Sequence, residues 1–339
     1  MTTALRRHPL GVVILFLSLV LSSCALIQHE RPVSHRSSRL FQFIYRAELP
    51  PIPAGEGPID LFVPLADENP DQQILKRDIM ASIPGTVRHE AGHGNRFWHG
   101  HVERSDGRPI EIEVDYEARR WVVTPPVPGR TDHPPRAILA RYLQPDRRGP
   151  VADPLIDAIR NDLQLGELSP EKKLRMIYDY VVDTMEYKKV GSGWGQGDTL
   201  WACSQRYGNC TDFHALVTSL ARAEGIPVRF EIGFPIPEGV PNGEISGYHC
   251  WLKAYLPGKG WFPLDASEAK KHPERRELYF GSQPADRILF TVGRDLRLSK
   301  AQANEPLNFF IYPHLEVAGR QVNGISYQFR YVELTDTPS

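Results

Sequence analysis

A turn followed by one amphipathic helix is the feature that most constrains the fold of this chain. Gly208 and Asn209 form a turn signal, and the apolar residues after them recur at the spacing of one helix face: Phe213, Leu216, Val217, Leu220 and Ala221. Gly225 and then Pro227 end the helical pattern. Because Asn209 is a favourable N-cap residue, Cys210 falls in the first turn of the predicted helix, where unpaired backbone N–H groups and the helix dipole favour a thiolate.

Two strand patterns follow the helix and carry residues suited to activate Cys210. Residues 248–255 read Tyr-His-Cys-Trp-Leu-Lys-Ala-Tyr and residues 261–265 read Trp-Phe-Pro-Leu-Asp, with a turn containing Pro and Gly between them. The pair predicts a hairpin that places His249 and Asp265 on neighbouring strands. A cysteine, a histidine and an aspartate in this arrangement supply a nucleophile, its base and a group that orients the base. We therefore predict that Cys210, His249 and Asp265 are catalytic.

These segments resemble the transglutaminase-like superfamily. The resemblance covers residues 170–296 and is carried by motifs in the family order: Gly-Asn-Cys-Thr-Asp at 208–212, Leu-Ala-Arg-Ala-Glu-Gly-Ile-Pro-Val-Arg at 220–229, His-Cys-Trp at 249–251 and the segment 255–265. It implies an α+β, papain-like fold in which a helix bearing the cysteine packs on an antiparallel sheet bearing the histidine and the aspartate. Cys250 departs from the pattern, since the family usually has a small residue after the histidine.

The resemblance implies acyl transfer at the amide groups of peptides or proteins. The thiolate of Cys210 would attack the carbonyl carbon, and the acyl group would pass to water in a protease or amidase, or to an amine in a transglutaminase. The backbone N–H of Cys210 is one expected oxyanion donor, and Trp201 or Gln205 could supply the second. The alternative is a catalytically silent protein of the same fold that binds a peptide or a glycan. Neither function calls for a cofactor, and the sequence does not indicate an oligomeric state.

The N-terminal residues predict export and lipidation. Basic residues precede an apolar run at residues 10–21, which is shorter than a membrane-spanning helix and typical of a secretory signal. The residues Leu-Ser-Ser-Cys that end at Cys24 resemble the bacterial lipoprotein cleavage site. We expect a signal peptide at 1–23, a lipid on Cys24 and a tether at 24–37. Because Ala25 gives no inner-membrane retention cue, we expect the protein at the outer membrane, facing the periplasm. The alternatives are an ordinary signal or an uncleaved anchor.

The composition indicates a folded protein without the charge of a nucleic-acid-binding chain. Hydrophobic residues make up 41% of the 339 residues, as in globular proteins, and 40 basic residues balance 41 acidic ones. Residues 38–128 predict a β-rich, sandwich-like N-terminal domain. A segment rich in Pro and Gly at 124–135 follows it, and we assign residues 136–334 to the transglutaminase-like domain. The strand patterns of the N-terminal domain lie at 40–48, 59–63, 86–89, 96–102, 110–114 and 121–123.

One motif suggests zinc, but its context argues against it. His-Glu-Ala-Gly-His at 89–93 matches a zinc-protease pattern, and His99 stands where one subclass has a third ligand. The glycines in this segment and the proline before it disfavour the helix that such a site needs, so we predict a hairpin turn instead. Cys210 and His214 are one helical turn apart, but no further ligand pair stands near them in the sequence. We therefore predict no metal site.

Two cysteines have no assigned role. Cys203 and Cys250 would be exported to an oxidising compartment, where a disulfide can form, but their pairing cannot be read from the sequence. Strand alternation points Cys250 away from the face of His249, which favours a small buried residue or half of a bridge over a second catalytic thiol. Before them, the Gly-rich residues 191–198 lack the ending of a phosphate loop and predict a wall of the cleft.

Overall fold

Six strands fill the β-rich segment. The computed structural model describes residue 1 and residues 36–125, 133–299, 302 and 305–335, so residues 2–23 of the predicted signal peptide and Cys24 lie outside the described residues. The strands are β1 (Ser38–Glu48), β2 (Ile59–Pro64), β3 (Gln72–Ala81), β4 (Gly85–His89), β5 (Arg96–Val102) and β6 (Glu111–Trp121). The period-two pattern is clear in β1, whose alternate residues are buried: Phe41, Phe43, Tyr45 and Ala47.

The strand β3 has no counterpart among the predicted strands. It lies at the edge of its sheet, and most of its side chains are polar or exposed. A shift of register between Ile74 and Lys76 further breaks the alternation of polar and apolar residues. Charged side chains on such an edge protect it from pairing with other strands. The same polar side chains remove the alternation of apolar residues by which a strand is predicted from a sequence.

Helices follow from residue 136, and α5 is the central one. They are α1 (Arg136–Arg141), α2 (Pro154–Asp162), α3 (Pro170–Thr184), α4 (Thr199–Gln205), α5 (Cys210–Ala223) and α6 (Ala266–Lys271); β7 (Glu186–Tyr187) and β8 (Tyr207–Gly208) form a short parallel pair between them. Every residue of α5 from Cys210 to Arg222 is buried, so neighbouring elements cover this helix on all sides. Among the described residues, no helix combines the length and the apolar content needed to span a bilayer.

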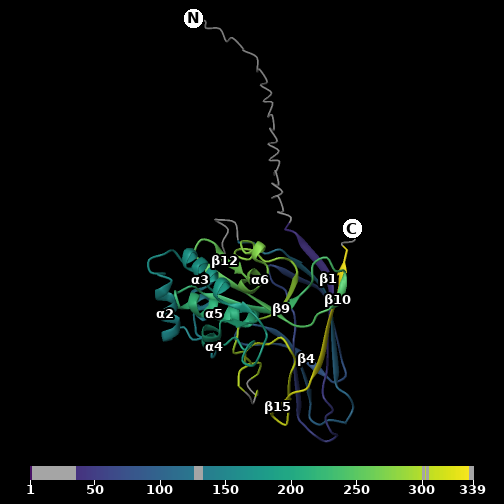
Figure 1. Cartoon of the computed structure of the whole chain (residues 1–339). Helices are drawn as coiled ribbons and strands as arrows, with labels where there is room; N and C mark the ends of the chain where they lie inside the picture. Colours follow the sequence, from purple (N-terminus) through teal and green to yellow (C-terminus); the bar gives the residue numbers. More distant parts are fainter. Residues whose placement is uncertain (2–35, 126–132, 300–301, 303–304, 336–339) are drawn as a thin grey trace. The chain divides into compact units, whose positions relative to one another are not determined.

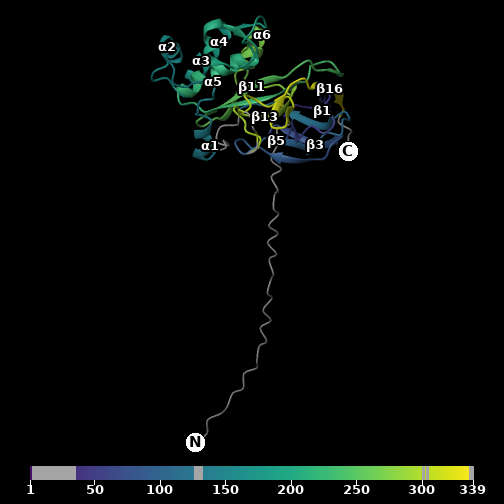
Figure 2. The same ribbon diagram turned by 90° about the horizontal axis from the view of Figure 1, so that it is seen from below.

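An antiparallel four-stranded sheet supports α5. Its order is β12-β11-β9-β13, and its strands are β9 (Val228–Pro235), β11 (His249–Leu256), β12 (Gly260–Leu264) and β13 (Arg287–Val292). The strands β11 and β12 form the predicted hairpin, and α5 packs on β9 and β11. Figures 1 and 2 show α3, α4 and α5 on one side of this sheet and β1 on the other. The predicted α+β arrangement of a cysteine-bearing helix on an antiparallel sheet is thus confirmed.

Two five-stranded sheets combine strands from both ends of the chain. Their orders are β10-β16-β1-β6-β3 and β15-β14-β2-β5-β4, in which the later strands are β10 (Asn242–Glu244), β14 (His314–Val317), β15 (Arg320–Val322) and β16 (Ser326–Leu334). Aromatic contacts join the first of them to the central sheet, since the ring centroid of Phe234 in β9 lies 5.3 Å from that of Phe43 in β1 and 4.2 Å from that of Phe329 in β16. The predicted segments 38–128 and 136–334 therefore share both sheets, and Arg36–Ser339 form one compact unit.

Candidate active site

The N-terminus of α5 positions Cys210. The side chain of Asn209 accepts a hydrogen bond from the backbone N–H of Thr211 at 2.9 Å, and the carboxylate of Asp212 accepts one from the N–H of Asn209 at 2.9 Å. This reciprocal capping box fixes where the helix begins. Cys210 is therefore the first residue of α5, as predicted, and its thiol lies at the positive end of the helix dipole.

The hairpin of β11 and β12 positions the other two predicted residues. His249 begins β11, and Asp265 directly follows β12 and caps α6. The distance between His249 Nε2 and Asp265 Oδ2 is 2.7 Å. Arg287 Nη1 donates to the same oxygen at 3.1 Å, and the N–H of Glu268 donates to Oδ1 at 3.0 Å. Asp265 is fully buried yet bonded at both oxygens, so its carboxylate is held in one orientation.

The pKa values of Cys210 and His249 shift in opposite directions. Burial alone would raise the pKa of Cys210, but hydrogen bonds from Cys250 and His249 and the charge of His249 hold it well below the usual range of a thiol. Burial alone would lower the pKa of His249, but the charge and the hydrogen bond of Asp265, together with the hydrogen bond of Cys210, raise it to about 10. Both shifts favour a thiolate beside an imidazolium at neutral pH.

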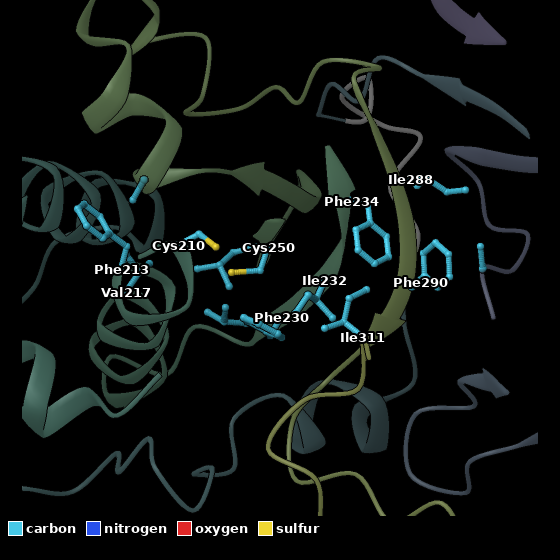
Figure 3. Packing of buried hydrophobic residues seen from close by; sticks show 14 of the residues in the cluster. Cys210, Phe213, Val217, Phe230, Ile232, Phe234, Cys250, Ile288, Phe290 and Ile311 are labelled. Carbon is cyan, nitrogen blue, oxygen red and sulfur yellow. The ribbon is translucent and has the colours of Figure 1, made fainter. Parts of the chain in front are cut away.

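Cys250 lies against Cys210, which strand alternation did not predict. Figure 3 shows the two sulfur atoms turned toward each other between α5 and the central sheet. Burial and then the interaction with Cys210 raise the pKa of Cys250 well above the usual value, so Cys250 keeps its proton, and its Sγ donates to Thr211 Oγ1 at 3.9 Å. His249 and Cys250 are the first two residues of β11. Both lie near the N-terminus of α5, because this end of the helix packs against the start of the strand.

Cys203, the remaining described cysteine, forms no disulfide bond. Cys203 and Cys250 are both free thiols, so the bridge between them that the sequence left open is absent. Cys203 lies in α4, where burial raises its pKa to about 11. The prediction that Cys250 is a small buried residue is confirmed, since its side chain is fully buried.

His214, which the sequence analysis considered only as a possible metal ligand beside Cys210, lies within the site. It lies one turn after Cys210 in α5 and is fully buried. Its Nδ1 atom is 3.4 Å from Cys250 Sγ, and its Nε2 atom is 3.5 Å from Asp265 Oδ1, which is too long for a well-formed hydrogen bond. The spacing of four residues from Cys210 was the available signal, because such residues share one helix face.

The Gly-rich segment 191–198 is anchored to the first turn of α5. The backbone N–H groups of Gly195 and Gly197 donate to the carboxylate of Asp212 at 2.6 and 3.0 Å. The segment also borders a cleft of about 750 Å³, which is lined by Arg147, Arg148, Gln196, Asp198, Asp295, Glu305, Pro306, Leu307, Asn308 and Gln321. Gln196 and Asp198 of the segment line this cleft but Cys210 does not, so a wall beside Cys210 stays a prediction.

The two residues suggested as second oxyanion donors have other surroundings. The indole of Trp201 packs edge-on against Tyr207, with ring centroids 5.2 Å apart. Gln205 is exposed at the end of α4. Neither placement assigns a second oxyanion donor.

The thiol of Cys210 is covered in this conformation. The exposed fraction is 1% for Cys210 and 6% for His249. Tyr248 lies beside them, where its hydroxyl bonds to Asn209 and Thr211 and its ring packs against Phe309. A substrate can therefore reach Cys210 only when covering side chains move.

Comparisons with known proteins agree with this geometry. Residues 157–266, which include Cys210, His249 and Asp265, match the family model described as the transglutaminase-like superfamily. An uncharacterized protein of Haemophilus influenzae is 25% identical over 358 aligned positions, which cover 92% of this chain and 96% of that protein.

A solved structure shows the same fold. The crystal structure of a candidate cysteine protease from Cytophaga hutchinsonii superposes with a TM-score of 0.57 at 17% identity, covering 89% of this chain and 93% of that one. The periplasmic domain of TgpA from Pseudomonas aeruginosa gives a TM-score of 0.38 at 18% identity, covering 70% of this chain and 90% of that one. The residues that match the model of the transglutaminase-like superfamily include α5 and the β11–β12 hairpin, the elements that carry Cys210, His249 and Asp265.

Proposed function

We propose that this chain is a cysteine acyl-transfer enzyme, a protease or amidase or else a transglutaminase, that acts on peptide or protein amides through Cys210, His249 and Asp265. The observation that carries the proposal is the 2.7 Å contact between His249 Nε2 and the buried Asp265, beside Cys210 at the start of α5, whose pKa His249 helps to lower. A shared fold alone would not support an activity. The opposite pKa shifts of Cys210 and His249 support an activity, because a thiolate beside an imidazolium is the reactive form of a cysteine nucleophile.

The proposed reaction begins with attack of the Cys210 thiolate on the amide carbonyl carbon. A carbon–sulfur bond forms, and the carbonyl oxygen becomes an oxyanion near the backbone N–H of Cys210 at the start of α5. The His249 imidazolium then gives its proton to the amide nitrogen, the carbon–nitrogen bond breaks and the amine leaves. The neutral imidazole next takes a proton from water or an acceptor amine, which attacks the thioester and returns Cys210 to the thiolate. Asp265 stabilises the imidazolium and fixes the ring.

We also propose that a lipid on Cys24 holds the enzyme at the outer membrane, facing the periplasm. The support is the N-terminal sequence, with its basic start, its apolar run and the residues that end at Cys24. Residues 24–37 would reach about 50 Å at full extension. The substrates within reach of such a tether are peptides or proteins close to the membrane surface.

Trapping the acyl-enzyme tests the activity. The purified full chain would be mixed with defined peptides, quenched in acid and measured by mass spectrometry for a thioester on Cys210. We expect the adduct in the parent chain and in Cys203→Ser, but not in Cys210→Ser. Adding a primary amine in excess then separates the two outcomes of acyl transfer, because a transglutaminase would join the amine to the peptide and a hydrolase would release the free acid.

The alternative function is a catalytically silent protein that binds a peptide or a glycan. The observation that favours it is the 1% exposure of Cys210, which leaves the thiol closed to substrate in this conformation. Two results together would support this alternative over the enzyme. The parent chain would form no adduct with any of the peptides, and the parent and Cys210→Ser would bind one of the peptides with equal affinity.

A further inference from the structure

We propose that Asp60, His99 and His101 form a binding site for a divalent transition metal of the zinc class, separate from Cys210 and independent of the function proposed for it. Among the residues that the structure describes, these three form the one group of histidine, cysteine and carboxylate side chains whose ligand atoms all lie within 4.8 Å of one another. The sequence analysis predicted no metal site, and it considered His99 only together with His89 and His93.

The geometry of the cluster comes from two paired strands. Asp60 is in β2 and the two histidines are in β5, where they are two residues apart and so share one face of the sheet. Asp60 lies directly opposite His101 in the register, and Phe62 lies opposite His99. Both imidazoles meet one carboxylate oxygen, with 2.7 Å between His99 Nε2 and Asp60 Oδ1 and 2.8 Å between His101 Nδ1 and the same oxygen. The ligand atoms thus converge from rigid elements, as a metal site requires.

The chemistry of the cluster selects the class of ion. Two imidazole nitrogens with one carboxylate oxygen suit zinc and other first-row transition metals, whereas calcium and magnesium take oxygen ligands. Such ions commonly complete their coordination with water. The side chains leave room for this, because the exposed fraction is 25% for Asp60, 11% for His99 and 41% for His101.

The neighbours of the cluster orient its ligands. His101 Nε2, the ring nitrogen that faces away from Asp60, lies 3.4 Å from Glu103 Oε1. The ring of His99 stacks on Phe62, with centroids 4.6 Å apart and an angle of 3° between the planes. Glu316 of β14 is the cross-strand partner of Asp60 on the other side and adds a buried carboxylate to the same row. A carboxylate on the outer nitrogen of a histidine is the usual support of a metal ligand.

The zinc-protease motif has a different arrangement. The strand β4 ends at His89, and the next residues form the predicted hairpin turn instead of a helix. In this turn the carboxylate of Glu90 accepts hydrogen bonds from the backbone N–H groups of Gly92 and His93. His89 is exposed and is not a member of the cluster, which makes it a matched control for the histidines of β5.

Calorimetric titration of the full chain with Zn²⁺, after dialysis against a chelator, tests the proposal. We expect one ion per chain and at least a tenfold loss of affinity in both Asp60→Asn and His99→Gln. His89→Ala should bind like the parent. Circular dichroism of the metal-free variants would establish that they are folded, and His101→Gln provides a second route to the same loss if either variant is not.

Titration with Co²⁺ separates this site from the thiols of the active site. Cobalt at Asp60, His99 and His101 should give no thiolate-to-metal charge-transfer absorption, and its spectrum should be unchanged in Cys210→Ser. The proposal is overturned if the parent binds no ion, if Asp60→Asn and His99→Gln bind as the parent does, or if binding is lost in Cys210→Ser instead.

Discussion

His214 Nδ1 lies 3.4 Å from Cys250 Sγ, inside the site and away from solvent. The other nitrogen of the same ring faces Asp265 Oδ1, while His249 bonds to Asp265 Oδ2. Two cysteine–histidine pairs therefore share one carboxylate, but the pKa shifts distinguish them. The pKa of Cys210 is lowered and that of Cys250 is raised, which suits Cys210 to the proposed role of nucleophile while Cys250 keeps its proton beside it.

Replacing Cys250 should weaken the nucleophile without removing it. Because the interaction with Cys250 helps to lower the pKa of Cys210, we expect Cys250→Ala to raise that pKa toward the range of an ordinary thiol. The rate of Cys210 alkylation as a function of pH measures this shift. Cys203→Ala removes a thiol from α4 and should leave the pKa of Cys210 unchanged. If Cys250→Ala also leaves it unchanged, the proposed role of Cys250 is wrong.

The charge of Asp265 should be essential to the proposed catalysis. In Asp265→Asn we expect kcat/KM to fall on the order of 10³–10⁴-fold, because the imidazolium loses its buried counter-charge and its orientation. The pKa of His249 should fall from about 10 toward its ordinary value, which NMR titration would follow.

Asp286 provides the matched control for Asp265. It bonds to the same guanidinium, with 3.1 Å between Arg287 Nε and Asp286 Oδ1. Asp286→Asn should therefore reproduce any effect of disturbing Arg287 while the His249 pKa stays near 10. Equal losses of activity in the two variants would show that Arg287, and not the charge beside His249, limits the reaction.

A buried ion pair should make folding sensitive to acid. Burial alone would raise the pKa of Asp71, but Lys253 of β11 and the nearby arginines lower it to about 2. A depressed pKa stabilises the fold above the unfolded value of 3.8, and this contribution is lost as the pH falls from about 4 toward 2. Asp71→Asn should cost about 3 kcal/mol at pH 7 and flatten the stability curve in that window.

Urea denaturation at pH 7 and at pH 3 measures both effects. Asp78→Asn breaks a second lysine–aspartate pair, that of Lys76 and Asp78, in which both side chains are more than half exposed. It should change the free energy of unfolding by less than about 1 kcal/mol. An Asp71→Asn chain as stable as Asp78→Asn at neutral pH would contradict the assignment of Asp71 to the buried pair.

The cap of α5 should contribute to stability through two contacts. Asn209→Ala removes the hydrogen bond to the N–H of Thr211 and the one to the hydroxyl of Tyr248, so we expect a loss of at least about 1 kcal/mol. Ser169→Ala provides a comparison, since Ser169 caps α3 through a longer bond of 3.5 Å to the N–H of Lys172. Thermal denaturation of both variants should rank Asn209→Ala as the less stable.

Local sequence signals predicted the centre of the site. The cap at Asn209 placed Cys210 at the start of a helix, and the turn between two strand patterns placed His249 near Asp265; the structure confirms both. These predictions succeeded because each depends on a few residues that are adjacent in the sequence. The assignment of Cys210, His249 and Asp265 to catalysis remains a proposal.

Contacts between distant segments could not be predicted in the same way. Arg287 reaches Asp265 from another strand, and Asp60 meets His99 and His101 only through the register of β2 and β5. The pairing of β16 with β1 joins segments almost 300 residues apart. Such pairings depend on which strand edges remain free once the chain has folded, and a single sequence carries no local signal for that.

Alkylation of Cys210 as a function of pH tests the central claim most directly. The purified full chain would be treated with iodoacetamide between pH 4 and pH 9, and the modified fraction of each cysteine would be read by mass spectrometry. The account predicts that Cys210 reacts well below the range of an ordinary thiol near pH 8.5, and that His249→Ala removes this reactivity. A Cys210 that reacts only as an ordinary thiol does, or remains inert after mild denaturant has opened the site, would contradict the thiolate–imidazolium pair and with it the proposed enzyme.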